Sequence, residues 1–341
     1  MNRQWKDKIL AVSPTEMEDL ALEIFQYQYA QNPVYRQYAD AVGRTPSTVD
    51  SIYQVPFLPI RFFKSHAIQN GSFEPEVVFE SSGTTGSTTS RHYIKDTILY
   101  KDVFSKTFRL FYGKPSNWCI IGLLPSYLER KNSSLVFMVD ELIKQSGHPS
   151  SGFYLNEYDK LKEVISELEQ KAQPTLLIGV TFGLLDFAEV YVQGVPAGVG
   201  GQPLKHTTII ETGGMKGRRE EMVREEMHAV LKEAFKVPFI HSEYGMTELI
   251  SQAWSFGNGI FKTPPWMKVV MRDEEDPFHL HQEGTGAINI IDLGNIHSCS
   301  FIATDDIGRL HSDGQFEVMG RLDNSDLRGC SLLVTHYAST P

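Results

Sequence analysis

The middle of the chain alternates short apolar runs with amphipathic stretches, and this alternation restricts the fold more than any other feature. Each of three apolar runs precedes such a stretch: 118–125 precedes 135–145, 174–181 precedes 182–192, and 207–214 precedes 219–235. Short apolar runs bounded by turn residues predict buried strands, and apolar residues spaced by three and four predict helices. Strands that alternate with helices form a mostly parallel sheet covered on both faces. We therefore predict an α/β fold.

The segments on either side of this pattern follow different rules. Residues 15–41 carry apolar residues at helical spacing, and Asn32-Pro33 interrupts this helix because a residue before proline avoids helical geometry. After about residue 260, short strands separated by Gly-Asp turns predict an antiparallel or barrel-like region. The sequence therefore predicts three parts: an N-terminal helical segment at 1–75 that packs on the core, an α/β core at 76–258, and a β-rich subdomain at 259–341.

Composition narrows the class of protein. The 341 residues are 41% hydrophobic and 22% charged, which is typical of a globular protein with a large core. The net charge of −10 disfavours a general nucleic-acid binder. Cys119, Cys299 and Cys330 cannot all pair with one another and show no CxxC spacing, which favours a reducing compartment. The N-terminus lacks a signal-peptide core, and no apolar run could span a membrane, so we predict a cytoplasmic protein.

One loop consists mostly of serine, threonine and glycine. FESSGTTGSTTSRH at 79–92 lies between the strand-like segments EVVFE and HYI. Successive backbone N–H groups in a glycine-rich turn form an anion site, and hydroxyl groups add further donors. The loop is not a Walker motif, because GxxxxGK[ST] is absent. Its composition by itself fits both a phosphate-binding loop and a plain connection.

Two more segments carry side chains suited to a nucleotide. HSEYGMTE at 241–248 follows a predicted strand, and TDDIGRL begins a segment at 304–329 that also contains GRLDNSDLRG. Tyr244 offers an aromatic face to a base, and Glu248 offers the hard oxygen ligand that Mg²⁺ prefers. Asp306 offers two acceptor oxygens to a vicinal diol. Each also has a structural interpretation, as a core tyrosine, a carboxylate in the first turn of a helix, or a turn aspartate.

Taken together, the three segments resemble the adenylate-forming superfamily of acyl-CoA ligases, synthetase adenylation domains and luciferases. The resemblance covers roughly residues 79–329. It implies the large N-terminal domain of such an enzyme, with layered α/β subdomains that bind nucleotide and acyl group at 76–258 and a small β-rich subdomain. ATP and Mg²⁺ are the implied cofactors.

The resemblance also assigns roles to individual residues. Thr247 and Glu248 are implied catalytic residues, and Glu248 is the implied magnesium ligand. The implied ATP- and AMP-binding residues are Ser81, Ser82, Gly83, Thr84, Thr85, Gly86, Gly213, Gly214, Tyr244, Gly245, Met246, Asp306 and Arg321.

The sequence departs from the superfamily in two places. Members continue past the GR motif with a small C-terminal domain that supplies a lysine for adenylation, whereas this sequence ends at Pro341. We therefore expect the usual C-terminal domain to be lacking. The lysine of the phosphate loop is also missing, because residues 87–90 are Ser, Thr, Thr and Ser. We expect either Arg91 or His92 to supply the positive charge of the missing lysine. Arg91 would then be a further catalytic residue.

As a short adenylating enzyme without the second domain, this sequence resembles one branch of the superfamily. That branch is the LuxE-like acyl-protein synthetases, the fatty-acid-activating component of bacterial luminescence reductases. IFQYQYAQNPVYRQY at 24–38, VPFLPIRFFKSH at 55–66 and LRGCSLLV at 327–334 look similar to that branch. The resemblance implies ATP-dependent activation of a carboxylic, and specifically a fatty, acid to acyl-AMP. The catalytic Cys330 would then accept the acyl group and pass it to a reductase or carrier protein. Cys330 also fits a small buried residue of a final strand.

Several alternatives stay open. The chain could be a catalytically reduced nucleotide-binding partner subunit, or an aryl- or acyl-CoA ligase of the phenylacetate type. The identity of the acid, the final acyl acceptor and the oligomeric state are not indicated. HLH at 279–281 and HSC at 297–299 have the alternation of residues on one face of a strand. If the two strands pair, His279, His281, His297 and Cys299 could form a zinc site; otherwise they belong to ordinary solvated strands. An acyl pocket or ordinary core packing explains Leu123, Phe182, Leu184, Leu185 and Phe187.

Overall fold

The computed structural model describes residues 2–81, 89–124, 132–193, 201–213, 222–273 and 275–322. Its helices are α1 Asn2–Ala11, α2 Met17–Gln31, α3 Pro33–Ala41, α4 Phe62–Ser65, α5 Thr97–Tyr112, η1 Pro115–Asn117, α6 Ser134–Ser146, α7 Tyr158–Gln170, α8 Thr181–Tyr191, α9 Arg224–Phe235 and η2 Leu293–Asn295. Its strands are β1 Leu58–Pro59, β2 Val77–Glu80, β3 Arg91–Ile94, β4 Cys119–Leu123, β5 Gly152–Phe153, β6 Thr175–Gly179, β7 Thr207–Glu211, β8 His241–Tyr244, β9 Ala253–Ser255, β10 Ile260–Lys262, β11 Met267–Arg272, β12 Leu280–His281, β13 Gly284–Asp292, β14 Phe301–Leu310 and β15 Phe316–Arg321. No helix among the described residues is long and apolar enough to cross a membrane.

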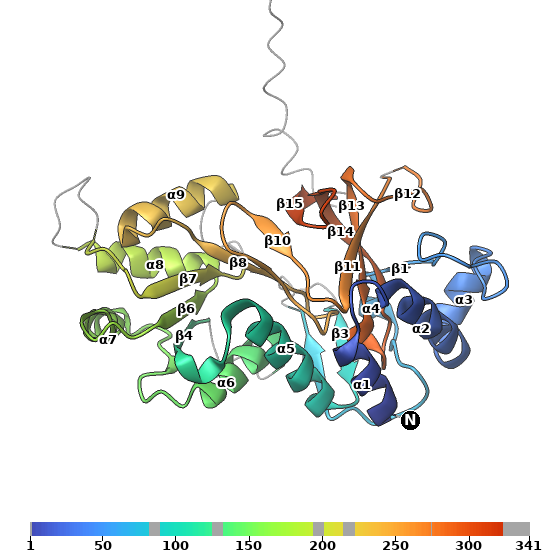
Figure 1. Ribbon diagram of the computed structural model, residues 1–341, viewed down its shortest axis with the longest axis horizontal. Coiled ribbons are helices and arrows are strands. Elements are labelled where there is room, and N and C mark those ends of the chain that lie inside the picture. Colours follow the sequence, from blue (N-terminus) through green and yellow to red (C-terminus); the bar gives the residue numbers. More distant parts are fainter. Residues whose placement is uncertain are drawn as a thin grey trace, which may run out of the picture.

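One large mixed sheet runs through the part of the chain that the structure describes. Its strand order is β12-β11-β13-β14-β15-β10-β9-β8-β7-β6-β4-β5, and β1 pairs with β14 at the side of this path (Figure 1). The strands β5, β4, β6, β7 and β8 run parallel to one another, and the remaining strands of this path, from β9 to β12, each pair antiparallel with the strand before them. We call the first group the parallel half and the second the antiparallel half.

Helices cover both faces of the parallel half, and its central strands β4 and β6 are mostly apolar. Ile120 and Leu176 point to the face covered by α5 and α6, whereas their neighbours Ile121 and Leu177 point to the face covered by α7, α8 and α9 (Figure 1). All residues of β4 and β6 are buried. A parallel sheet with helices on both faces requires such continuous apolar strands. The predicted α/β alternation is therefore confirmed.

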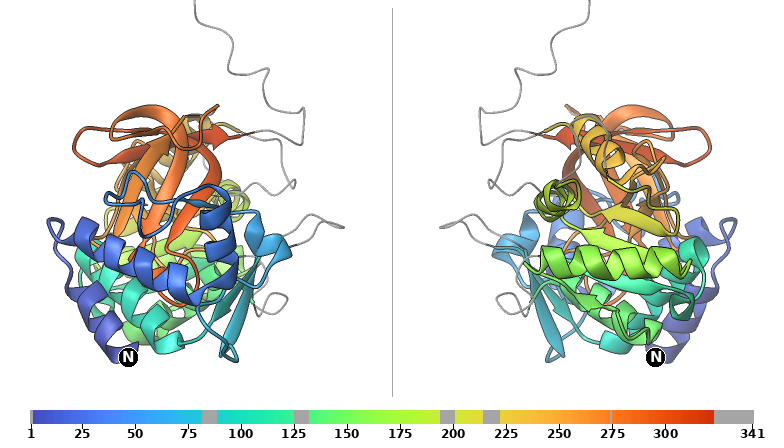
Figure 2. Two further views of the ribbon diagram at one scale, coloured as in Figure 1. Left: turned by 90° about the vertical axis from the view of Figure 1, so that its right-hand side faces the viewer. Right: turned by 90° about the vertical axis from the view of Figure 1, so that its left-hand side faces the viewer.

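The N-terminal helices pack on the antiparallel half. Figure 2 shows the blue N-terminal helices lying against the orange strands. Phe25 in α2 meets the ring of Phe301 edge-on at 6.2 Å, and Tyr35 in α3 stacks on the same ring at 6.1 Å. Asn32 separates the two helices: its side chain accepts a hydrogen bond from the Tyr35 N–H and donates one to the Ser298 carbonyl. The interruption predicted at Asn32-Pro33 is confirmed, and Asn32 also ties the helices to the sheet.

The structure corrects several local predictions. The helix predicted at 219–235 corresponds to α9, which begins later, at Arg224, because residues 222–223 are not helical. The segment at 55–63 contains the two-residue strand β1 before the chain turns into α4. Two helices, α1 and α7, were not predicted, although α7 buries Leu161, Ile165 and Leu168 at helical spacing. That spacing is legible in the sequence.

Candidate functional site

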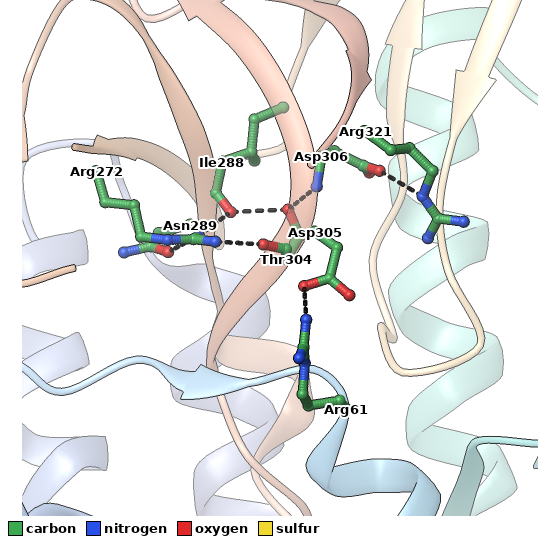
Figure 3. A network of polar contacts seen from close by, with 8 residues as sticks. All are labelled: Arg61, Arg272, Ile288, Asn289, Thr304, Asp305, Asp306 and Arg321. Carbon is green, nitrogen blue, oxygen red and sulfur yellow. Dashed lines mark hydrogen bonds and ion pairs between the residues drawn. The ribbon is translucent and has the colours of Figure 1, made fainter. Parts of the chain in front are cut away.

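The segment at 241–248 and the described part of the segment at 304–329 meet where the two halves of the sheet join. Tyr244 ends β8, and its hydroxyl donates a hydrogen bond of 2.9 Å to Oδ2 of Asp306 in β14. Oδ1 of Asp306 pairs with Nε of Arg321 at the end of β15, at 3.3 Å (Figure 3). Asp306 therefore contacts both Tyr244 from the segment at 241–248 and Arg321 from its own segment at 304–329. Their common carboxylate is 7% exposed, and burial raises the pKa of Asp306.

Tyr244 is held on most sides by protein. Its ring packs against Phe261 and Phe316, with centroid distances of 5.8 and 5.5 Å, and 8% of the residue is exposed. Burial, followed by the nearby Asp306 carboxylate, raises the pKa of Tyr244 well above its ordinary value. Its neutral hydroxyl is therefore a fixed donor that orients Asp306. Stacking of adenine on this ring stays a prediction, and the exposed surface available for it is small.

Asp306 lies in an irregular part of β14. The pairing of β13 with β14 shifts register between Ala287 and Asn289, so Ile288 lies opposite the segment that contains residues 304–306. The Asp306 N–H donates to Oγ1 of Thr304 at 3.2 Å, and that hydroxyl donates to the Ile288 carbonyl at 2.8 Å (Figure 3). A β-bulge of this kind bends a strand and redirects its side chains. Here it aims Asp305 and Asp306 in different directions.

Arg272 stabilises the bulge. This residue is buried, and its guanidinium group donates to the carbonyls of Ile288 at 3.0 Å and Thr304 at 2.6 Å and to Oδ1 of Asn289 at 2.7 Å (Figure 3). These donors satisfy carbonyl groups that the irregular ladder leaves without N–H partners. The sequence does not indicate this contact, because the partners of Arg272 lie 16 to 32 residues away along the chain.

Glu248 is fixed by contacts from three directions. It is 6% exposed, and burial raises its pKa, whereas a hydrogen bond from the Ser90 hydroxyl and the charges of Arg321 and Lys64 lower it. Its backbone carbonyl accepts a hydrogen bond of 2.8 Å from Nδ2 of Asn295. The preceding carbonyl, that of Thr247, lies 2.8 Å from Nδ1 of His92. The Thr247–Glu248 segment is therefore anchored to both β3 and η2.

A second carboxylate holds the chain just beyond Glu248. Asp292 at the end of β13 is fully buried, and it accepts hydrogen bonds from the N–H groups of Ile250 at 2.8 Å and Ser251 at 2.9 Å. It also accepts the Ser251 hydroxyl at 2.6 Å and the Gly294 N–H at 3.0 Å. Asp292 thereby joins the loop after β8 to the antiparallel half.

The two ends of the serine- and threonine-rich loop lie together beside Glu248. β2 and β3 pair antiparallel, with Glu80 opposite Arg91. The Ser81 N–H donates to the Ser90 carbonyl at 3.0 Å, and the Ser90 N–H donates to Oγ of Ser81 at 2.9 Å. Ser82, Gly83, Thr84, Thr85 and Gly86 lie outside the described residues. The described ends of this loop are therefore fixed beside the implied magnesium ligand.

Arg91 and His92 differ in their ability to supply a positive charge. Arg91 is exposed, whereas His92 is 1% exposed. Burial lowers the pKa of His92 to about 4, so its ring is neutral at physiological pH. The expectation that His92 replaces the missing lysine is therefore wrong: its ring packs edge-on against Phe63 and bonds the Thr247 carbonyl. A role for Arg91 stays a prediction.

The ends of β7 and β8 carry two more acids. Glu211 is 3% exposed, accepts the Thr181 hydroxyl at 3.0 Å, and also accepts the Gly213 N–H. Burial and the charge of Glu211 raise the pKa of Glu243 to about 8. Gly213 adopts a φ of +76°, which favours glycine, and a Cβ at Gly245 would collide with the Glu243 carboxyl. The carboxyl ends of parallel strands are where α/β proteins bind ligands.

Other predicted residues do not join this cluster. Leu184, Leu185 and Phe187 are buried in the core formed with α7 and α9, together with Leu123, while Phe182 belongs to the larger core. Core packing accounts for these five residues. Met246 is partly buried against the larger core, and Thr247 is partly exposed. Gly214 and Cys330 lie outside the described residues.

The four predicted zinc ligands do not come together. Within the described residues, one group of three histidine, cysteine or acidic side chains could hold a metal ion. It consists of Asp273, His279 and His281, whose ligand atoms all lie within 4.8 Å of one another. Cys299 is fully buried, and its thiol lies 3.3 Å from the Phe301 carbonyl. His297 packs against Phe73. Residues 297–299 follow η2 rather than forming a strand, so the prediction of paired HLH and HSC strands is wrong.

The magnesium expectation fits the residues present. Glu248 is a buried carboxylate whose pKa is raised by burial, and a divalent cation beside it would offset the cost of its charge. Thr247 adds a hydroxyl oxygen from the neighbouring position. Mg²⁺ bound to phosphates takes one or two protein carboxylates and keeps its other positions for water and phosphate oxygens. Thr247 and Glu248 would therefore hold it.

The family comparison covers almost the whole chain. The family described as "Acyl-protein synthetase, LuxE" matches residues 12–338. Among curated protein sequences, none matches the chain.

Solved structures share its fold at low sequence identity. 2-Hydroxyisobutyryl-CoA ligase, in the postadenylation state in complex with R3-HIB-AMP, gives a TM-score of 0.65 at 12% identity over 95% of this chain and 72% of that chain. ATP-bound MatB from Rhodopseudomonas palustris gives 0.51 at 14% identity, over 73% of this chain and 49% of that one. A luciferase-like enzyme from the nonluminescent Zophobas morio mealworm gives 0.51 at 14%, over 75% and 60%. The chain thus spans about half the length of MatB, and these likenesses establish the predicted fold class.

Proposed function

The chain belongs to the LuxE family of acyl-protein synthetases, and from that membership we propose that it uses ATP to activate a carboxylic acid as acyl-AMP. The acyl group then passes to a thiol. A fatty acid is the proposed substrate class, and Cys330 is the proposed first acceptor, which hands the acyl group to a reductase or carrier protein.

The observation that carries the proposal is the convergence of motif residues at the join of the sheet. Tyr244 bonds Asp306, Asp306 pairs with Arg321, and the base of the serine- and threonine-rich loop bonds Glu248 through Ser90. A nucleotide with its ribose on Asp306 and its phosphates toward Glu248 would touch each of these segments. An unrelated role for the loop offers no reason for this arrangement.

The first step is the attack of a substrate carboxylate oxygen on the α-phosphorus of ATP. The bond between the α-phosphorus and its bridging oxygen breaks, and pyrophosphate leaves with the electron pair. Mg²⁺, when bound, neutralises charge that develops on the phosphate oxygens. This chain's residues orient the reactants: Asp306 accepts hydrogen bonds from the ribose hydroxyls, and Ser90 keeps Glu248 turned toward the phosphates.

The second step forms a thioester. The Cys330 thiolate attacks the acyl carbonyl carbon of acyl-AMP, the bond to the phosphate oxygen breaks, and AMP leaves. A cysteine sulfur suits this step because the thiolate is a strong nucleophile, and the thioester keeps the acyl group activated for later transfer. Arg328 is two residues away in the sequence, and a nearby cation would lower the pKa of the thiol.

Exchange of labelled pyrophosphate into ATP tests the first step. We expect exchange that requires both Mg²⁺ and a carboxylic acid, with fatty acids more active than aryl acids in a panel. Exchange with aryl acids alone, and release of an acyl-CoA, would instead favour a ligase of the phenylacetate type. Measurable ATP binding without exchange for any acid would contradict the proposal and favour a nucleotide-binding partner subunit.

Intact-mass spectrometry tests the acceptor. Incubation with ATP, Mg²⁺ and the active acid should add one acyl mass to the protein, and Cys330→Ser should abolish the adduct while exchange continues. Cys119→Ser is the matched control, because Cys119 is fully buried and its pKa is raised by burial to about 11. An adduct that survives in Cys330→Ser would exclude Cys330 as the acceptor.

A further inference from the structure

A short basic turn from the N-terminal region lies beside the candidate site. β1 pairs parallel with β14, with Leu58 opposite Ile302 and Pro59 opposite Ala303, and the Ile60 N–H donates to the Ala303 carbonyl at 2.9 Å. The chain leaves this pairing where β14 reaches its bulge, and Arg61 follows at once. Nη2 of Arg61 lies 3.3 Å from Oδ1 of Asp305, next to Asp306 (Figure 3).

Lys64 is positioned by the residue before it. Phe63 in α4 is 1% exposed, and its ring meets the ring of His92 edge-on at a centroid distance of 5.8 Å. His92 in turn contacts the Thr247 carbonyl. Phe63 is therefore anchored against the Thr247–Glu248 segment, and the exposed Lys64 follows it at the surface.

Both cations are free to take another partner. The Arg61 side chain is 60% exposed, and its contact with Asp305 is a single, partly exposed ion pair, which contributes little stability. Lys64 is exposed, and neither a hydrogen bond nor a salt bridge to it is recorded within the described residues. Among sequence positions 79–90 there is no lysine or arginine, so the phosphate loop itself brings no positive side chain.

We propose that Arg61 and Lys64 form a cationic subsite for the phosphate groups of ATP, a role that rests on the nucleotide site proposed above. Arg61 lies beside Asp305, the residue before Asp306, and Lys64 follows Phe63, whose ring packs on His92 beside the Thr247 carbonyl. A guanidinium forks onto phosphate oxygens, and an ammonium binds them as a point charge. Together they stabilise the charge on the departing pyrophosphate. The turn at 61–65 thus supplies charge that the serine- and threonine-rich loop lacks.

Calorimetric binding of ATP and of adenosine, each with Mg²⁺ and without acid, tests the subsite. We expect the wild-type protein to bind ATP more tightly than adenosine. Lys64→Gln and Arg61→Gln should each weaken ATP binding by about tenfold, the size of one charge-assisted hydrogen bond, and leave adenosine binding unchanged. Lys64→Arg should retain most of the ATP affinity. Lys171→Gln is the matched control, because this exposed lysine lies at the end of α7, and it should change neither affinity.

Two results would overturn the subsite. One is an ATP affinity that is the same in Lys64→Gln and Arg61→Gln as in the wild type, or a wild type that binds ATP no better than adenosine. The other is an equal loss of ATP and adenosine binding, which would show a structural role for the turn. Because binding is measured without acid, a protein that binds ATP but exchanges no pyrophosphate contradicts the proposed enzyme and leaves the subsite supported. Full exchange with unchanged affinities contradicts the subsite alone.

Discussion

The two halves of the sheet bring acidic groups to the candidate site in different ways. The parallel half presents Glu211 and Glu243 at strand ends, where burial raises the pKa of Glu243 to about 8. The antiparallel half presents Asp305 and Asp306 from within β14, at a bulge, and pairs them with Arg61 and Arg321. A strand end exposes side chains without disturbing the ladder, whereas a mid-strand site needs a bulge and a buried group such as Arg272 to satisfy the freed carbonyls.

This difference separates two electrostatic environments within one site. On the parallel side, burial and the charge of Glu211 raise the pKa of Glu243 to about 8, and on the antiparallel side Asp305 and Asp306 each pair with a guanidinium group. The contacts that join the sides include the Tyr244–Asp306 hydrogen bond and the Asp292 bonds to Ile250 and Ser251. Substitutions in the parallel half and in the antiparallel half should therefore differ in their effects on unfolding free energy, on catalysis and on the pH dependence of stability.

Removal of the Asp292 joint should have the largest effect on stability. Asp292→Ala leaves three buried N–H groups, those of Ile250, Ser251 and Gly294, without their acceptor. We expect a loss of about 3–5 kcal/mol in the free energy of unfolding, measured by urea titration. Asp313→Ala is the control, because Asp313 is an exposed turn residue that should cost under about 1 kcal/mol. Equal midpoints for the two variants would show that Asp292 does not join the halves.

Asp306→Asn should reduce catalysis more than stability. The substitution keeps the size of the side chain but removes the charge that faces Arg321 and accepts the ribose hydroxyls. We expect acid-dependent pyrophosphate exchange to fall on the order of 100-fold, mainly through a raised KM for ATP, since hydrogen bonds to charged groups contribute about 1.5–3 kcal/mol.

The neighbouring Asp305→Asn provides the comparison for this variant. Asp305 contacts Arg61 at the surface, and its change should reduce exchange by less than about threefold. If both substitutions reduced exchange by the same factor, the separate orientations that the bulge gives to Asp305 and Asp306 would have no functional meaning.

Glu243→Gln should change how stability depends on pH. The pKa of Glu243 is raised to about 8 in the folded protein, against 4.5 for an ordinary glutamate, so its contribution is fully present below about pH 4.5 and is lost as pH rises through 8. The wild type should lose on the order of 2 kcal/mol of unfolding free energy between pH 5 and 9 relative to Glu243→Gln, since residual solvent contact screens this partly exposed side chain. Parallel curves for the two proteins over that window would contradict a neutral Glu243.

The smallest effect is expected far from the join. Lys171 pairs with Glu167 at 3.6 Å in α7, and both side chains are about 70% exposed. Lys171→Ala should change the free energy of unfolding by less than about 0.5 kcal/mol, because water and salt screen such pairs. A loss above 1 kcal/mol in the same urea titration would mean that surface charge contributes more to this fold than its exposure indicates.

The sequence predicted the parallel half well because each of its signals is local. Apolar runs, helical spacing and the break at Asn32-Pro33 are all legible within a few residues. Tyr244, Glu248 and Asp306 were recognisable because they belong to motifs. Arg272, Asp292 and Arg61 were not, because each acts through partners distant in the sequence, up to 244 residues away for Arg61 and Asp305. His92 was misjudged for the same reason: a polar residue in a short strand does not reveal which face it occupies.

Hydrogen exchange of the protein with and without Mg²⁺-ATP tests most directly whether one nucleotide occupies the join. We predict slower exchange upon binding in peptides that cover the β2–β3 hairpin, residues 241–252 and residues 301–310, and unchanged exchange in α7 and α9. Protection confined to any one of those three segments, or protection of α7 and α9 instead, would contradict the claim that the three segments close around a single ATP molecule.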